Sequence, residues 1–90
     1  MPTSEPQTTT ERLVRAVQPA IRYLDRLDPL AQLAEGKEAL SALLAVSAQV
    51  AARRRAAVRE LRLQGWKLQE IANELGVSRQ QVSNIERGKD

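Results

Sequence analysis

Polar side chains able to form hydrogen bonds with nucleic-acid bases recur over residues 79–87. Val82 and Ile85 are three residues apart, so on a helix they share the inward face. The polar residues left on the outer face are Arg79, Gln80, Ser83, Asn84 and Arg87. In the major groove, Arg can make two hydrogen bonds to guanine, and Gln or Asn can make two to adenine. The outer face therefore suits base recognition as well as phosphate contact, whereas a merely solvated face more often carries Glu and Lys.

The residues before this face have the spacing that two short crossing helices need. Such helices touch at fixed offsets that hold small or apolar residues. These offsets are occupied by Ile71, Ala72, Leu75, Val77, Val82 and Ile85. Gly76 can adopt the left-handed conformation that ends a helix, and the Ser78 hydroxyl can cap the next helix. The pattern predicts one helix up to Leu75 and a second that starts at about Arg79.

The run EIANELGVSRQQVSNIERGK closely resembles the phage-repressor type of helix-turn-helix. The resemblance covers residues 53–90 if RRRAAVRELRLQG is counted as the supporting helix. It implies that the helix from Ser78 to Arg87 enters the major groove of double-stranded DNA. The residues it places nearest the bases are Arg79, Gln80, Ser83 and Asn84. Those expected to contact phosphate are Lys67, Gln69, Ser78, Gln81, Arg87 and Lys89.

Two positions depart from this family pattern. Lys67 stands where such motifs usually place a Ser or Thr cap, and Leu68 stands where many have a phosphate-contacting Gln. Both changes resemble the tri-helical promoter-reading domain of sigma factors. Phage-repressor domains also continue with further helices after the motif, so we expect the N-terminal half of this chain to supply that packing.

Composition and charge agree with a small DNA-binding protein. The chain has 90 residues, a net charge of +3, and neither Cys nor His. Residues 1–51 carry five basic against six acidic side chains, whereas residues 52–90 carry nine basic against five acidic ones. The half with the motif is thus the half attracted to phosphate. The absence of Cys excludes disulfides and thiolate metal sites, and no run resembles a signal peptide or a membrane span.

The N-terminal half is expected to be helical after a disordered arm of residues 1–9. Thr10 can cap a helix that starts at Glu11 and continues, kinked, across Pro19. Asp28 and Pro29 favour a short helix to about Ala34, which Gly36 should end. Residues 37–64 lack Gly and Pro and can form one continuous helix. Its last part, with Ala57, Val58 and Leu61, should pack beneath Ile71 and Ile85 as the first helix of the tri-helical unit.

The apolar residues of the N-terminal helices allow two arrangements. They can fold back on their own DNA-binding unit, or they can form a two-fold homodimer. The small size and the family resemblance favour the dimer, because two units about 34 Å apart can bind successive major-groove faces. We accordingly divide the chain into an arm, a helical packing and dimerisation segment at residues 10–51, and a helix-turn-helix segment at residues 52–90.

Several residues have a structural interpretation beside a functional one. Arg53, Arg54 and Arg55 can hold phosphate, but three successive helical positions point in three directions. Trp66 can stack on a base, yet its position favours a hydrophobic clasp across the turn. A cation at Lys67 opposes the helix dipole, so phosphate contact suits it better than capping. Glu70 and Glu74 are expected to lie on a solvated face, where they can pair with nearby cations.

The sequence therefore predicts an all-α, sequence-specific DNA-binding transcriptional regulator of bacterial, phage or plasmid origin. We expect it to be cytoplasmic and nucleoid-associated, to use neither a cofactor nor a metal, and to act as a repressor rather than an activator. Nothing in it suggests catalysis, since a Gly-rich phosphate loop and a nucleophile beside a base are both missing. The alternatives are an adaptor or sigma-like module that binds the transcription machinery, and a plasmid-partition or nucleoid protein.

Overall fold

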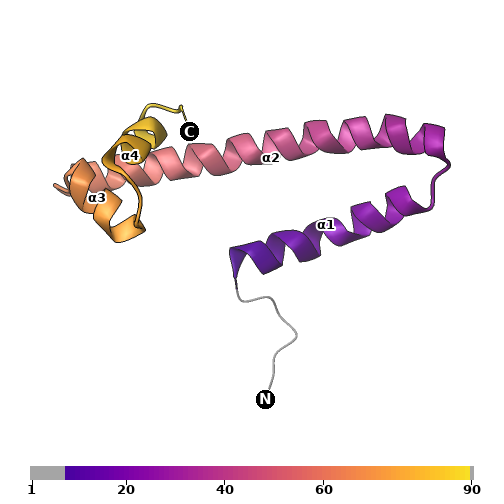
Figure 1. Cartoon of the computed structure of the whole chain (residues 1–90), viewed down its shortest axis with the longest axis horizontal. Helices are drawn as coiled ribbons and strands as arrows, with labels where there is room; N and C mark the ends of the chain where they lie inside the picture. The colour runs from indigo at the N-terminus through magenta and orange to yellow at the C-terminus, as the bar shows by residue number, and fades with distance from the viewer. Residues whose placement is uncertain (1–7, 90) are drawn as a thin grey trace, which may run out of the picture. The chain divides into compact units, whose positions relative to one another are not determined.

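The computed structural model describes residues 8–89, and this part of the chain folds into helices without a strand. The helices are α1 (Thr9–Asp25), α2 (Pro29–Leu63), α3 (Leu68–Leu75) and α4 (Arg79–Glu86) (Figure 1). The expected all-α class is confirmed. The chain divides into two compact units, Met1–Ser41 and Ala42–Asp90, and α2 contributes to both.

The first unit begins with a helix cap two residues earlier than expected. Thr8 is the N-cap, and its side-chain oxygen accepts a hydrogen bond from the Glu11 N–H at 3.0 Å. The prediction of Thr10 as the cap was therefore wrong: capping by Thr8 adds Thr9 and Thr10 to the helix. Thr8 and Thr9 of the expected disordered arm are thus ordered here, and residues 1–7 lie outside the described residues. The helix is continuous across Pro19, as predicted.

A short turn joins α1 to α2 within this unit. Asp28 Oδ1 accepts a hydrogen bond from the Ala31 N–H at 2.9 Å, so the Asp28 cap and the start at Pro29 are confirmed. Gln32 Nε2 donates to the Leu24 carbonyl at 2.9 Å and ties the start of α2 to the end of α1. Within this unit, α1 and the start of α2 form a helical hairpin (Figure 1).

The prediction that Gly36 ends a helix was wrong, because α2 runs through it to Leu63. Gly36 lacks the positive φ of the other glycines, and the residues around it, Leu33-Ala34-Glu35 and Lys37-Glu38-Ala39, favour helix. A single glycine weakens a helix by only about 1 kcal/mol relative to alanine, so its neighbours keep α2 continuous.

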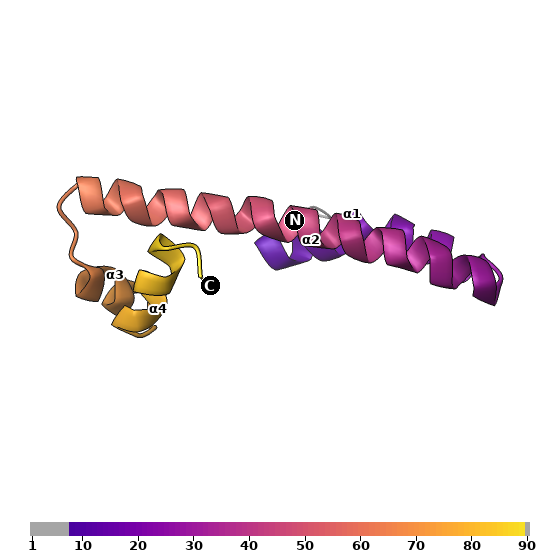
Figure 2. The same cartoon turned by 90° about the horizontal axis from the view of Figure 1, so that it is seen from above.

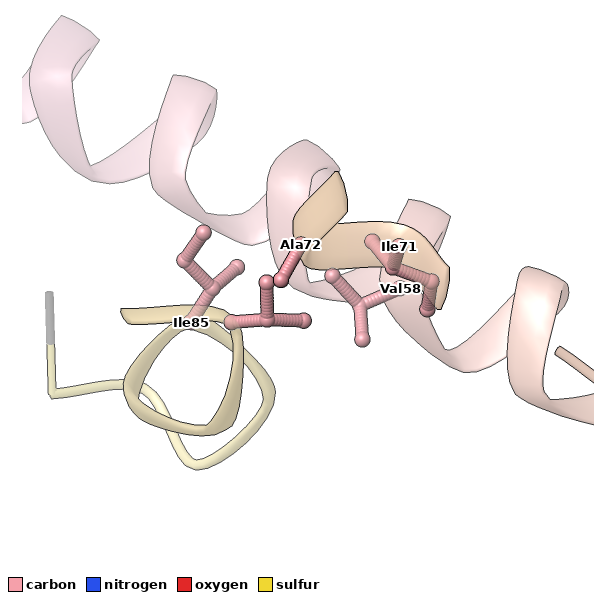
Figure 3. Close-up of a cluster of buried hydrophobic side chains, with 5 residues drawn as sticks. Val58, Ile71, Ala72 and Ile85 are labelled. Atoms are coloured by element: carbon pink, nitrogen blue, oxygen red, sulfur yellow. The ribbon is translucent and has the colours of Figure 1, made fainter. Parts of the chain in front are cut away.

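The core lies in the second unit, where α3 and α4 lie on the same side of the end of α2 (Figure 2). Its buried residues are Val58, Ile71, Ala72, Val82 and Ile85. The labelled side chains from α2, α3 and α4 point toward one another (Figure 3). Leu61, Trp66 and Leu68 are partly buried against this cluster. Val58 and Leu61 thus pack beneath the motif as predicted, whereas Ala57 stays exposed.

Glycines with positive φ end the three helices of this unit. Gly65, Gly76 and Gly88 have φ of 97°, 69° and 74°. After each, an N–H bonds to a carbonyl five residues back, which satisfies an otherwise free group at the helix end. The sharp stops allow α3 and α4 to be only eight residues each and still cross within the unit.

No helix in residues 8–89 has both the length and the apolar composition needed to cross a membrane.

Candidate nucleic-acid interface

The start of α3 is capped by a side chain of its own first turn, that of Glu70. Lys67 occupies the N-cap position with extended backbone and makes no side-chain cap. Glu70 Oε1 accepts a hydrogen bond from the Lys67 N–H at 2.9 Å. Glu70 is exposed, as expected, and it also caps the start of α3. Lys67 has only donors on its side chain and is exposed, so its ammonium group can meet an anion at the start of α3.

The turn between α3 and α4 follows the prediction closely. Gly76 is left-handed, and Ser78 is the N-cap of α4. The Ser78 oxygen accepts from the Gln81 N–H at 3.1 Å, and Gln81 Oε1 accepts from the Ser78 N–H at 2.9 Å. This reciprocal capping box anchors the start of α4. It also commits one oxygen of each predicted phosphate-contacting side chain to the fold.

The two faces of α4 differ sharply. Val82 and Ile85 are buried in the core, as predicted. On the opposite face Arg79, Gln80 and Arg87 are exposed, whereas Ser83 and Asn84 are half-buried. All the predicted base-contacting residues thus lie on a helix whose underside is fixed by the core.

Asn84 connects three residues of the outer face. Its Oδ1 accepts a hydrogen bond from Gln80 Nε2 at 3.0 Å and another from Arg87 Nη2 at 3.3 Å. Gln80 and Asn84 are one helical turn apart, and Arg87 follows within the next. The three side chains therefore form one hydrogen-bonded network along α4, which the order of residue types alone did not reveal.

The chain after α4 is held against its end. The Lys89 N–H donates to the Asn84 carbonyl at 2.7 Å, and the Gly88 N–H donates to the Ile85 carbonyl at 3.1 Å. A Cβ atom added to Gly88 would lie 2.6 Å from Arg55 Nη1. The Arg55 guanidinium therefore lies against the end of α4. Lys89 is exposed.

Three basic residues surround a hollow at the starts of α3 and α4. Arg62, Lys67 and Arg79 line it together with Leu68 and Gln69. Arg62 Nη1 also donates to the Trp66 carbonyl at 3.2 Å, and its Nε lies 3.5 Å from Glu86 Oε2. Gln69 Nε2 donates to Asn73 Oδ1 at 2.9 Å. The hollow gathers Lys67, Gln69 and Arg79, which the sequence predicted to face DNA, with Arg62, which it did not single out.

The three successive arginines of α2 point in different directions, as expected. Arg53 Nη1 donates to the Gln49 carbonyl of its own helix at 2.9 Å. Arg54 lines a groove with Leu75 and Val77, and Arg55 lies against Gly88. Arg53 and Arg55 thus have structural contacts of their own. Trp66 is packed against the core, so the clasp interpretation is confirmed.

Two residues expected at the helix contact lie outside the core. Leu75 is 57% exposed and Val77 is 37% exposed. They line an open groove with Arg54, Gln81, Asn84 and Ile85. The contact between α3 and α4 is made through Ile71 and Ala72 of α3. Within the described residues no further helix covers the turn between them. The expectation that Leu75 and Val77 lie at the contact between the two helices was therefore wrong for burial.

Comparison with known protein families matches residues 57–90 to the family described as helix-turn-helix. The match spans the end of α2, the turn, α3 and α4. Residues 57–90 thus match a helix-turn-helix family, which supports the resemblance to the phage-repressor type. Residues 1–56 lie outside the match. Comparisons with curated proteins and with solved structures gave no match.

Within residues 8–89, no group of three or more His, Cys, Asp or Glu side chains is placed to hold a metal ion.

Proposed function

We propose that this protein is a sequence-specific transcriptional regulator that places α4 in the major groove of its operator. The observation that carries the proposal is the contrast between the faces of α4. Val82 and Ile85 are buried in the core, whereas Arg79, Gln80 and Arg87 of the polar outer face are exposed. A helix whose inner face is packed on the core and whose start is capped by Ser78 can present side chains to base edges with little loss of conformational entropy.

Phosphate contacts would come from the basic hollow at the helix starts. Lys67 and Arg79 line it, and the N–H groups at the first turns of α3 and α4 add favourable dipoles. Gln69, Ser78, Gln81 and Lys89 are the further residues that we assign to phosphate contact. Neutralising several phosphates releases counterions, so affinity should fall steeply with salt.

We further propose that the segment 10–51 dimerises the protein, which leaves the segment 52–90 to bind DNA. Large apolar side chains of this segment are exposed, among them Leu40 at 65%, Leu43 at 50% and Val50 at 46%. Exposed apolar side chains in such number favour association, because burial of each removes apolar surface from water. A two-fold dimer would recognise an inverted repeat.

Repression by covering a promoter is the mode of regulation we propose, with the nucleoid of the cytoplasm as the place of action. A helix-turn-helix dimer needs no other part to block polymerase. This distinguishes it from an activator, which must also recruit polymerase.

The experiment that tests the proposal is selection of bound duplexes from a random pool by the purified full chain at near-physiological salt. We expect enrichment of an inverted repeat whose half-sites lie about 10 base pairs apart, or a multiple of that. Failure to enrich any sequence, with binding that disappears on modest addition of salt, would contradict sequence-specific recognition.

An adaptor function is the second candidate, favoured by the open groove of Leu75 and Val77 beside Arg54. Apolar side chains exposed around a basic residue suit a protein partner better than a sugar-phosphate backbone. The selection experiment separates the two functions, because an adaptor would enrich no operator. A partition or nucleoid protein would instead enrich an array of repeated sites.

A further inference from the structure

We propose that Arg87 contacts a guanine in the major groove and that Asn84 is a positioning residue that holds the Arg87 guanidinium for this contact. The inference rests on the proposed DNA binding by α4. It divides the work of the outer face differently from the sequence-based prediction, which placed Asn84 on a base and Arg87 on phosphate.

The first argument is the hydrogen-bond capacity of Asn84. Its Oδ1 accepts from both Gln80 Nε2 and Arg87 Nη2. An amide oxygen has two lone pairs, so these two bonds fill it. A paired contact with adenine needs that oxygen for the adenine amino group and the amide N–H for the ring nitrogen. Asn84 can make this contact only by releasing both neighbours, which disfavours it as a direct adenine reader.

The second argument is the number of hydrogen-bond donors that Arg87 retains after it bonds to Asn84. A guanidinium has five N–H donors, and the bond to Asn84 uses one. The remaining donors are enough for two parallel hydrogen bonds to the acceptors of guanine. Arg87 is exposed and shares the outer face with Gln80. Its position and its free donors therefore suit a guanine at the base pair that faces the end of α4.

The third argument is that the backbone around Arg87 is fixed. Its N–H donates to the Ser83 carbonyl at 3.1 Å, and the next turn is closed by the bond from the Lys89 N–H to the Asn84 carbonyl at 2.7 Å. The side chain is thus tethered at both ends, by its backbone and by Asn84. An arginine held in this way loses less entropy on binding than a free one, so the contact can discriminate between bases.

The test measures the affinity of the full-length protein for its selected operator and for operators with each base pair replaced in turn. Arg87→Ala should abolish the preference for guanine at one base pair of each half-site, about 5- to 150-fold, and leave the preferences elsewhere unchanged. Arg53→Ala is the matched control, since it removes the same charge from α2 at a residue bonded to its own helix. It should leave all base preferences intact.

Asn84 is tested by two substitutions. Asn84→Ala should weaken the same guanine preference because Arg87 loses its acceptor. Asn84→Asp keeps an oxygen that accepts from Arg87 and should retain the guanine preference, while its negative charge lowers the affinity for every sequence alike. A circular dichroism spectrum of each variant checks that the helices are intact.

Two outcomes would overturn the inference and leave the proposed function standing. One is an equal loss of affinity on all sequences for Arg87→Ala, which would assign Arg87 to phosphate. The other is loss of an adenine preference for Asn84→Asp with the guanine preference unchanged, which would make Asn84 the direct reader. If the unaltered protein discriminates between no sequences at all, the proposed function itself fails.

Discussion

The two units of the chain contain the same kinds of apolar side chain but bury them to different extents. In the described part of Met1–Ser41 no residue is buried, although Leu13, Ile21 and Leu40 carry large side chains. In Ala42–Asp90 five apolar residues are at most 4% exposed. In the second unit the end of α2, α3 and α4 surround one core, whereas the first unit is a hairpin of two helices. Two helices offer each apolar side chain one neighbouring helix, so one side of it stays in water.

This difference indicates where each unit obtains its stability. The second unit has a core of its own, and its helices are ended by glycines and started by capping residues. The described part of the first unit lacks a buried core, so its exposed leucines can stabilise the protein fully only when another surface covers them. We propose that the cover is a second copy of the chain, and the predictions below test the contrast between the units.

The largest expected effect is on the core of the second unit. Ile71→Ala should lower the free energy of unfolding by about 2–5 kcal/mol, because it removes buried methyl groups and leaves a cavity. Denaturation in urea followed by circular dichroism measures it. Leu30→Ala is the control in the first unit, where Leu30 is 77% exposed and the expected change is within about 0.5 kcal/mol. Equal losses for both variants would refute the contrast.

The next effect concerns association. Leu43→Glu places a charge on the exposed apolar face of α2 and should weaken self-association at least tenfold, since a charge is costly to bury in a helix interface. Sedimentation equilibrium measures the change. Leu63→Glu, at a side chain 84% exposed, is the matched control and should leave association unchanged. A protein that is monomeric before any substitution would contradict the dimer.

Two glycines give opposite predictions. Gly76→Ala should destabilise the protein by about 1–2 kcal/mol, because the φ of 69° is left-handed. Gly36→Ala should stabilise it by up to about 1 kcal/mol, because Gly36 is inside α2 and an added Cβ would meet no atom within 4 Å. Thermal denaturation of both variants checks the signs. A gain in stability for Gly76→Ala would be incompatible with the observed end of α3.

The smallest effects concern the caps. Ser78→Ala and Asp28→Ala each remove one acceptor for a helix-start N–H and should each cost about 1 kcal/mol. Only Ser78 starts the helix proposed to enter the groove, so only its loss should also weaken operator binding. Fluorescence anisotropy with a labelled operator measures this. Equal weakening by Asp28→Ala would show that the first unit contributes to DNA contact.

Much of the second unit could be predicted because its signals are local. Gly76 and Ser78 are two residues apart, and each sets a backbone feature by its own chemistry. The inward placement of Val82 and Ile85 follows from helical spacing. The same local rules failed in the first unit. Three consecutive threonines can all cap a helix, so Thr8 could not be distinguished from Thr10, and Gly36 resembled a stop although no cap follows it closely.

The candidate site was only partly predictable. The residue types on α4 indicated DNA contact, but the bonds from Gln80 and Arg87 to one oxygen of Asn84 depend on how neighbouring side chains share a helical turn. Arg62 was missed because Glu86, its ion-pair partner, comes close only when α4 packs beside the end of α2.

The sequence by itself determined the class of the motif, the sharp ends of α3 and α4 and the face of α4 that turns inward. These features depend on interactions within a few residues, which residue type and spacing specify. Only the tertiary structure decided that Leu75 and Val77 stay exposed and that Arg55 lies against Gly88. Those features depend on contacts between separate helices, and the burial of a side chain is set by which surfaces the fold brings against it.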